Sequence, residues 1–282
     1  MLVKTNHSKM SGIAIPAPER YYDYFLKSIY NLRVNIGYMD PIEIWEIGDE
    51  LTNEMRDILS LFPNIVFKNT TDYDDRIEHW RGFQAKAPVI KHSKLNDIII
   101  CDADVTLFQD PSIIQKSAEY IETGSFMFLD FSYYYFDLPI EKHSDQINIS
   151  KFNSHDYYDK RRSFVRKICP DPPSFFPIEW GHLYNDSYPT TLAPEGLVEA
   201  GVFYINRERH SDVIDTFYEF NCDWKESYEC VYGDKEITWL SFMRHHKKVT
   251  LNKVEPVSYN GLICQLYNDS PFYVQKYDVE HT

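Results

Sequence analysis

With 43 acidic and 29 basic residues among its 282, the chain carries a formal net charge of −14, which excludes nucleic acid as a main partner because phosphate backbones require clustered Lys and Arg. Apolar residues make up 43% of the chain and aromatic residues 16%, which excludes a disordered protein. Residues 1–11 lack an apolar targeting core, and no stretch approaches the roughly 20 apolar residues of a membrane span. We therefore expect no membrane span and a soluble, cytoplasmic chain, lumenal only if a targeting segment is missing from this sequence.

The first part of the chain alternates short apolar runs with stretches of helical periodicity. We predict strands at 12–17, 42–47, 64–67, 98–101 and 125–129, the second with alternating polarity, and helices at 21–34, 51–61, 80–92 and 113–121. Strand and helix in alternation predict a parallel sheet with right-handed crossovers. Residues 12–130 are therefore expected to form a nucleotide-binding α/β half.

An acidic pair follows the fourth of these strands. The apolar run 98–101 ends in Asp102 and Asp104, one residue apart. Ligands of open α/β sheets bind at the carboxyl ends of the strands, and paired carboxylates there suit a hard cation that bridges them to substrate phosphates. The pattern predicts a Mg²⁺ or Mn²⁺ site. Asp130 ends a further strand, which we expect to lie next to the central one.

Residues 131–196 interrupt the alternation. They are rich in Tyr, Phe, Pro and Asp and include Trp180 and His182. Long irregular stretches of compact domains are commonly functional loops, so an acceptor-binding segment is expected, with a surface-packed insertion as the alternative. Residues 197–282 regain order, with strands at 198–205 and 249–254, helices at 207–220 and 237–245, and a loop at 258–264. We expect them to be the acceptor-side and catalytic half of a single domain spanning 1–282.

Asp-x-Asp after a strand occurs in two unrelated chemistries. In nucleotide-sugar glycosyltransferases of the GT-A type, the pair holds a metal on the donor's diphosphate. In phosphatases of the haloacid-dehalogenase type, whose pattern residues 102–107 also match, the first Asp is a nucleophile. That motif normally follows the first strand of its domain, whereas at least three predicted strands precede Asp102. The transferase is therefore favoured.

Five stretches, in the same order along the chain, resemble the mannosyltransferase family that includes the fungal Golgi α-1,3-mannosyltransferases. They are 12–17, 41–50, 82–86 with the acidic pair behind it, 199–206 and 233–236, and the resemblance spans residues 12–265. It implies a GT-A fold, a divalent cation (Mn²⁺ first, Mg²⁺ second), a nucleotide-sugar donor and retention at the anomeric carbon. Two features depart from the family: no membrane anchor is expected here, and residues 272–276 read Phe-Tyr-Val-Gln-Lys where the family carries a His after an aromatic residue.

Individual roles follow from the acidic pair and the resemblance. Asp104 is expected to ligate the metal directly, and Asp102 to contact the donor ribose or the metal through water. Lys86 and Lys235 are expected to meet the donor diphosphate, with an ordinary surface charge and a salt bridge as the alternatives. The remaining donor candidates are Pro16, Ala17 and Ala103.

Two further carboxylates are candidate catalytic groups. Glu199 and Asp234 are expected to bind acceptor hydroxyls or to stabilise the oxocarbenium-like centre of sugar transfer. A strand-edge charge and a helix N-terminal acid are the respective alternatives. The weaker acceptor-side candidates are Asp130, Trp180 and His182.

The predicted function is metal-dependent transfer of a hexose from a nucleotide-diphosphate sugar to a glycan or protein-linked acceptor. The family favours a mannose-like sugar, GDP-mannose as donor and retention, and UDP-sugars stay open. The alternatives are the phosphatase, with Asp102 as nucleophile, and a non-catalytic sugar-binding relative.

Overall fold

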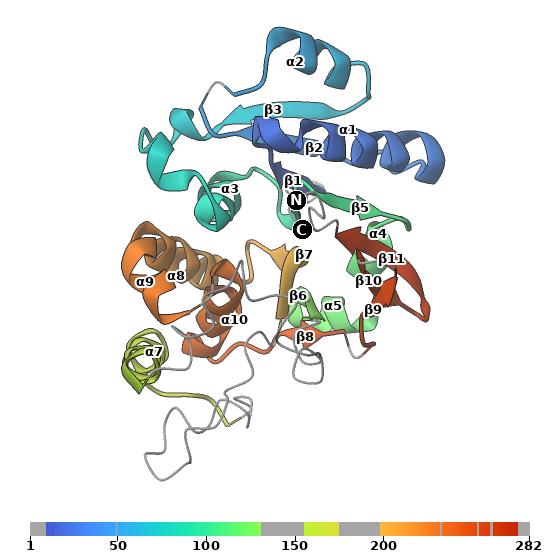
Figure 1. Cartoon of the computed structure of the whole chain (residues 1–282). Helices are drawn as coiled ribbons and strands as arrows, with labels where there is room; N and C mark the ends of the chain where they lie inside the picture. Colours follow the sequence, from blue (N-terminus) through green and yellow to red (C-terminus); the bar gives the residue numbers. More distant parts are fainter. Residues whose placement is uncertain are drawn as a thin grey trace, which may run out of the picture.

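The computed structural model describes residues 10–48, 50–130, 155–174, 198–231, 233–252, 254–259 and 262–275. A seven-stranded sheet of order β3-β2-β1-β4-β7-β6-β8 runs through this part of the chain (Figure 1). Its strands are β1 Ser11–Pro16, β2 Ile42–Glu46, β3 Ile65–Asn69, β4 Asp97–Cys101, β6 Ser125–Leu129, β7 Val198–Asn206 and β8 Thr250–Leu251. The predicted α/β fold class is confirmed.

The strands β3, β2, β1 and β4 are parallel neighbours, as the alternation of strand and helix predicts. Strands of a parallel sheet are covered on both faces and need continuous apolar sequences. β2 is buried at all five positions, so its alternating polarity does not mark a solvent face. One of its two polar residues, Glu43, is buried and accepts a hydrogen bond from Trp45 Nε1 at 2.9 Å.

β7 runs antiparallel to both of its neighbours and separates β4 from β6. The prediction that the strand ending in Asp130 adjoins the central strand is therefore wrong. Because β7 opposes both strands, β6 runs in the same direction as β4. The carboxyl end of β6, and Asp130 with it, still reaches the same edge of the sheet as Asp102.

Helices cover one face of the large sheet, and helices together with a second sheet cover the other. Figure 1 shows α3, α8, α9 and α10 on its left and α4, α5 and the small sheet on its right. Alternate residues of β4 point to opposite faces: Ile98 packs in one core with Phe217 and Leu240, and Ile99 in the other with Phe272. The helices are α1 Tyr22–Tyr30 with a π-helical continuation Asn31–Ile36, α2 Asn53–Leu59, α3 Lys86–His92, α4 Ser112–Gln115, α5 Ala118–Thr123, α7 His155–Ile168, α8 Ser211–Cys222, α9 Trp224–Cys230 and α10 Asp234–Arg244.

The small sheet has the order β5-β11-β10-β9 and is antiparallel throughout. Its strands are β5 Val105–Leu107, β9 Val257–Tyr259, β10 Leu262–Tyr267 and β11 Ser270–Gln275. The predicted loop at 258–264 is therefore wrong, because it contains parts of β9 and β10. Asn268 and Asp269 adopt positive φ angles of 50° and 58°, the conformation that a two-residue hairpin turn between β10 and β11 requires.

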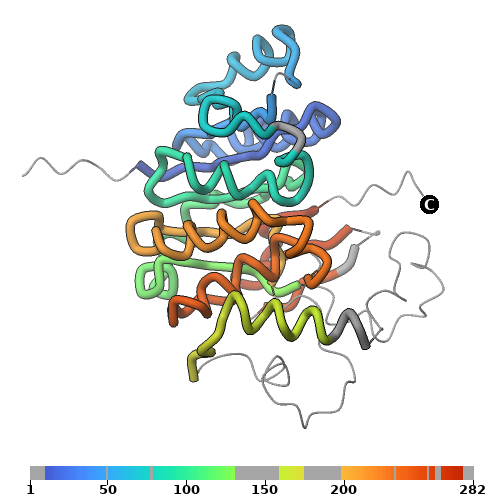
Figure 2. The backbone as a smooth tube through the Cα atoms, turned by 90° about the vertical axis from the view of Figure 1, so that its left-hand side faces the viewer, coloured from blue at the N-terminus to red at the C-terminus, as the bar shows by residue number. Residues whose placement is uncertain are grey.

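Several elements differ from the prediction. The helix expected at 113–121 is divided into α4 and α5, α9 was not predicted, and the strand expected at 249–254 is limited to the two residues of β8. The helix expected at 80–92 begins only at Lys86, after a 3₁₀ turn at Phe83–Ala85, so Pro88 lies in its first turn, where proline is tolerated. α7 lies inside the stretch expected to be irregular, and Phe164 and Val165 enter the core. In both views α7 and α2 lie at opposite ends of the molecule (Figures 1 and 2). No helix among the described residues is long and apolar enough to cross a bilayer.

Candidate functional site

The carboxyl ends of β1, β4 and β6 and the amino end of β7 meet at one edge of the large sheet. The acidic loop lies there, between β4 and β5. Its backbone is fixed at both ends, because Asp102 N donates to Gly201 O at 2.8 Å and Val105 N donates to Asp102 O at 3.1 Å. The loop therefore presents Asp102 and Asp104 from a rigid turn.

A bulge in β7 supports this loop. Met127 of β6 faces Phe203, but the next residue, Phe128, faces Glu199, so β7 carries extra residues between these pairs. Bulges of this kind are frequent beside active sites, where they redirect side chains. Here the bulge turns Glu199 back onto its own strand, and its Oε1 accepts hydrogen bonds from Ala200 N and Gly201 N, both at 2.9 Å.

Lys86 links α3, the acidic loop, β7 and α10. Its Nζ lies 2.8 Å from Asp102 Oδ1 and 3.0 Å from Asp234 Oδ2, and donates to Ala200 O at 2.7 Å. Only 4% of Lys86 is exposed. Burial lowers the pKa of this amine, but the two carboxylates outweigh it, so the pKa lies above its ordinary value and Lys86 stays charged.

The sequence before Lys86 explains how it reaches this position. Gly82 adopts a φ of +147°, a conformation that L side chains rarely adopt, and a Cβ there would also lie 2.7 Å from Gln84 Oε1. Gln84 Nε2 donates to His79 O at 2.7 Å and holds the turn closed. Lys86 then begins α3, where the helix dipole opposes a cation by ~0.3–1 kcal/mol. Asp102 and Asp234 offset this cost.

A second buried ion pair lies beside the first. Lys235 Nζ, from the first turn of α10, is 2.6 Å from Asp130 Oδ2. The sequence left a salt bridge open for Lys235, and that is the contact observed. Burial and the nearby charge of Asp130 raise the pKa of Glu199 to about 7. Burial likewise raises the pKa of Asp102 to about 7, against the opposing effect of Lys86.

The acidic pair has the chemistry of a hard-cation site. Asp104 is half-buried, and a quarter of the Asp102 side chain is exposed, so both carboxylates are reachable from the edge of the sheet. Within the described ranges, no three His, Cys, Asp or Glu side chains are grouped so as to hold a metal. Two protein carboxylates are nonetheless enough for Mg²⁺ or Mn²⁺ when substrate phosphates and water complete the shell.

Gln275 is a site residue that sequence reasoning missed. In the β5–β11 pairing it lies opposite Val105, the residue after Asp104. Its Oε1 lies against Gly201, 3.1 Å from where a Cβ would be, and it is buried without a hydrogen-bond partner among the described residues. The sequence offered one signal, which is that residues 272–276 contain no His although the family resemblance implies one after an aromatic residue in this region.

The other predicted donor residues lie at the same edge. Pro16 ends β1, and Ala17 N donates to Trp45 O at 2.8 Å. Ala103, between the two acids, is 6% exposed. Trp180 and His182 lie outside the described residues. The roles of all these residues stay predictions.

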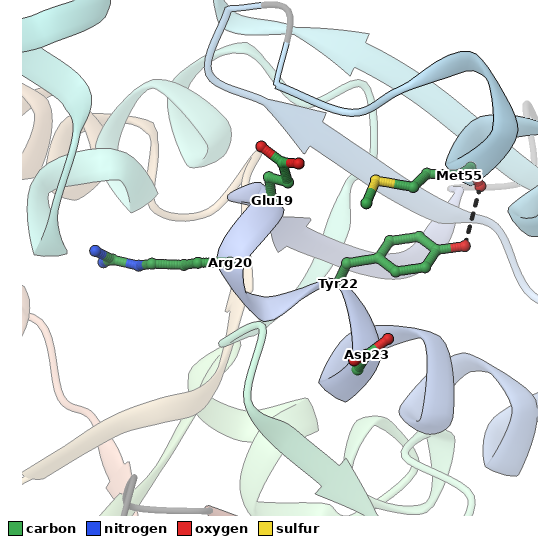
Figure 3. Close-up of a pocket in the computed structure, with 5 residues that line it drawn as sticks. All are labelled: Glu19, Arg20, Tyr22, Asp23 and Met55. Atoms are coloured by element: carbon green, nitrogen blue, oxygen red, sulfur yellow. Dashed lines mark hydrogen bonds between the residues drawn. The ribbon is translucent and has the colours of Figure 1, made fainter. Parts of the chain in front are cut away.

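A surface hollow lies beyond the ends of β1 and β2, where the first turns of α1 and α2 meet. It has a volume of about 400 Å³ and is lined by Glu19, Arg20, Tyr22, Asp23 and Met55. Tyr22 Oη donates to Met55 O at 3.3 Å, while the Arg20 side chain points away from the other four (Figure 3). Because β1 and β2 are parallel to β4, the hollow lies at the same edge of the sheet as the acidic pair.

A mixed α/β sheet with an acidic loop at the end of its central strand defines the class: the fold is the GT-A fold of glycosyltransferases. More particularly, a family model described as "Mannosyltransferase putative" matches residues 10–262, and the chain belongs to this family. Neither the fold nor the family supports the phosphatase, since Asp102 follows the fourth strand along the chain.

Two relatives illustrate the match. The chain is 27% identical over 173 residues to "Putative alpha-1,3-mannosyltransferase MNN12" of Candida albicans, an alignment that covers 60% of this chain and 18% of that protein. The structure of the present chain resembles that of Core-mannan synthase A (CmsA/Ktr4) from Aspergillus fumigatus, solved in its Mn/GDP form, with a TM-score of 0.56 and 11% identity. That match covers 94% of this chain and 80% of the other and concerns the fold alone.

Proposed function

We propose that the chain transfers a mannose-like hexose, with retention, from a nucleoside-diphosphate sugar to a glycan or protein-linked acceptor. The observation that carries this proposal is the acidic loop at the carboxyl end of β4, tied to the bulge of β7 by Asp102 N and Gly201 O. Membership of the mannosyltransferase family supports the sugar. GDP-mannose as donor and Mn²⁺ as the cation follow the family resemblance, and the Aspergillus enzyme of the same fold was itself solved with Mn and GDP.

Asp102 and Asp104 would hold the cation. When bound, a divalent cation neutralises the charge that develops on the leaving diphosphate. Lys86 and Asp234 are buried behind Asp102, and Lys86 Nζ lies 3.0 Å from Asp234 Oδ2. We therefore propose that these two residues position the Asp102 carboxylate. In this role Asp234 supports the site without contacting the acceptor.

The donor and acceptor would approach along the same edge. We assign the nucleoside to the side of Pro16 and Ala17, toward the hollow at the start of α1. Glu199 lies on the other side of the acidic loop, beside the Lys235–Asp130 pair. A carboxyl with a pKa near 7 suits proton exchange with a sugar hydroxyl at neutral pH, and we assign Glu199 and Asp130 to the acceptor side.

The first test is thermal unfolding with GDP, UDP and dTDP, each with and without Mn²⁺. A ligand at 100 times its Kd stabilises the native state by ~2.7 kcal/mol, which raises the unfolding midpoint by roughly 5 °C for a chain of this size. We expect this shift for GDP with Mn²⁺ and a much smaller one without the metal. Release of GDP from GDP-mannose then separates an enzyme from a non-catalytic sugar-binding relative.

The matched variants are Asp104→Asn and Asp215→Asn. Asp104→Asn removes a proposed ligand charge without changing side-chain volume, and we expect it to abolish the Mn²⁺-dependent shift and the GDP release. Asp215 pairs with Lys91 at the surface, where 63% of its side chain is exposed, and its variant should behave as the parent. If no nucleotide shifts the midpoint while fluoroberyllate with metal does, the transferase proposal is wrong and the phosphatase is favoured.

A further inference from the structure

The position of Gln275 is set by the small sheet. β5 begins directly after Asp104, and β11 pairs with it so that Tyr273 faces Leu107, Val274 faces Thr106 and Gln275 faces Val105. This antiparallel register brings the last residue of β11 beside the acidic loop. Phe272 and Tyr273, which anchor β11, are fully buried, so the register is held by the core.

The Gln275 side chain turns toward the support of the loop. Its Oε1 lies against Gly201, whose carbonyl accepts the hydrogen bond from Asp102 N. A side chain at position 201 would come within 3.1 Å of Gln275 Oε1 and 3.4 Å of Glu199 Oε1. Glycine at position 201 therefore leaves the space in which the amide oxygen lies.

That oxygen is buried and accepts no hydrogen bond from any described residue. A buried acceptor left unsatisfied costs ~1–3 kcal/mol, so such an atom at the residue that supports the acidic loop, on a strand paired with the residue after Asp104, requires an explanation. A bound cation supplies one, because amide oxygens are ordinary ligands of hard divalent ions and suit Mg²⁺ and Mn²⁺.

We propose that Gln275 Oε1 is the third protein ligand of the divalent cation held by Asp102 and Asp104; this rests on the proposed function and deepens it. The ligand set is then three oxygens, of which one is neutral. An imidazole nitrogen favours Zn²⁺, Co²⁺ and Ni²⁺ more than an amide oxygen does. The site is therefore biased toward Mn²⁺ and Mg²⁺ and discriminates against the softer ions.

The test measures cation binding directly. Mn²⁺ binding to the full chain is titrated by electron paramagnetic resonance of the free ion, with and without GDP, for the parent, Gln275→Ala, Gln275→His and Gln109→Ala. Gln109 is the control amide, because its Nε2 binds Ser270 O and Pro271 O at the opposite end of β11. We expect Gln275→Ala to weaken Mn²⁺ binding by ~10–100-fold, as loss of a ligand or its support does, and Gln109→Ala to leave it unchanged.

Gln275→His tests the ligand role itself. We expect it to keep Mn²⁺ binding, to raise the affinity for Zn²⁺ relative to Mg²⁺ at least tenfold, and to add an imidazole-nitrogen modulation to the spin-echo spectrum of bound Mn²⁺. Gln275→Ala should unfold at the same urea concentration as the parent, or higher, without metal, because it removes an unsatisfied buried oxygen.

Separate outcomes overturn the inference and the function. If the parent binds Mn²⁺ and Gln275→Ala binds it equally well, Gln275 is not a ligand, whatever the activity of the protein. If Gln275→Ala instead weakens GDP binding in the absence of metal, the amide contacts the donor and the inference is wrong. If the parent binds no Mn²⁺ with or without GDP, the metal-dependent function itself fails.

Discussion

Replacing Lys86 by Met isolates the energetic role of the buried cation. Methionine keeps an unbranched stem of similar volume, so the cavity contribution is small. What is lost is the charge between Asp102 and Asp234 and the donor to Ala200 O. With 4% of Lys86 exposed, water cannot replace the amine.

Removing one partner of a buried ion pair costs ~3–5 kcal/mol, because the remaining charge is left uncompensated. The control lies on the same helix: Lys91 pairs with Asp215, and their side chains are 33% and 63% exposed. An exposed pair contributes ~0–1 kcal/mol. Lys86→Met should therefore lose several times more free energy of unfolding than Lys91→Met.

Urea unfolding followed by tryptophan fluorescence measures both variants, since urea does not screen charges as a salt would. The double variant Lys86→Met/Asp234→Asn should lose less than the sum of its single changes by at least ~1 kcal/mol, as groups in direct contact do. Equal losses for Lys86→Met and Lys91→Met, or strict additivity in the double variant, would refute the idea that buried carboxylates depend on this amine.

Two further predictions concern residues outside the acidic loop. Gly82→Ala should destabilise the protein by ~1–3 kcal/mol in the same urea assay. The reason is that the φ of +147° at Gly82 is essentially restricted to glycine, and a Cβ would also lie 2.7 Å from Gln84 Oε1. An unchanged urea midpoint would contradict the positive φ angle at position 82. His210 is 3% exposed, and burial lowers its pKa to about 4. Between pH 4 and pH 6.5 the unfolded chain therefore binds a proton at this histidine that the folded chain does not. The contribution of His210 to the free energy of unfolding consequently falls as the pH falls through this window. His210→Gln, which can keep the hydrogen bond to Thr123 O, should reduce the difference between the urea midpoints at pH 5 and pH 7.5, and an unaltered difference would show that His210 does not titrate there.

The elements that the sequence predicted correctly have local signals. The strands β1, β4 and β6 are short apolar runs whose side chains pack alternately into the two cores, as Ile98 and Ile99 illustrate. Such runs can be recognised in the sequence without knowing their neighbours. The acidic pair was readable for the same reason, because carboxylates directly after a buried strand have no packing role. Where a local signal was ambiguous, as at Pro88 or in residues 258–264, the predicted element boundaries were wrong.

The sequence by itself therefore determined the fold class, the central strand and the candidate metal-binding pair. Only the tertiary structure decided that β7 lies between β4 and β6, that its bulge presents the carbonyls of Ala200 and Gly201, and that Gln275 ends β11 beside Asp104. Each of these depends on hydrogen-bond register between segments far apart in the chain. Register is selected by burial of whole strand faces, and no single residue in one sequence carries that information.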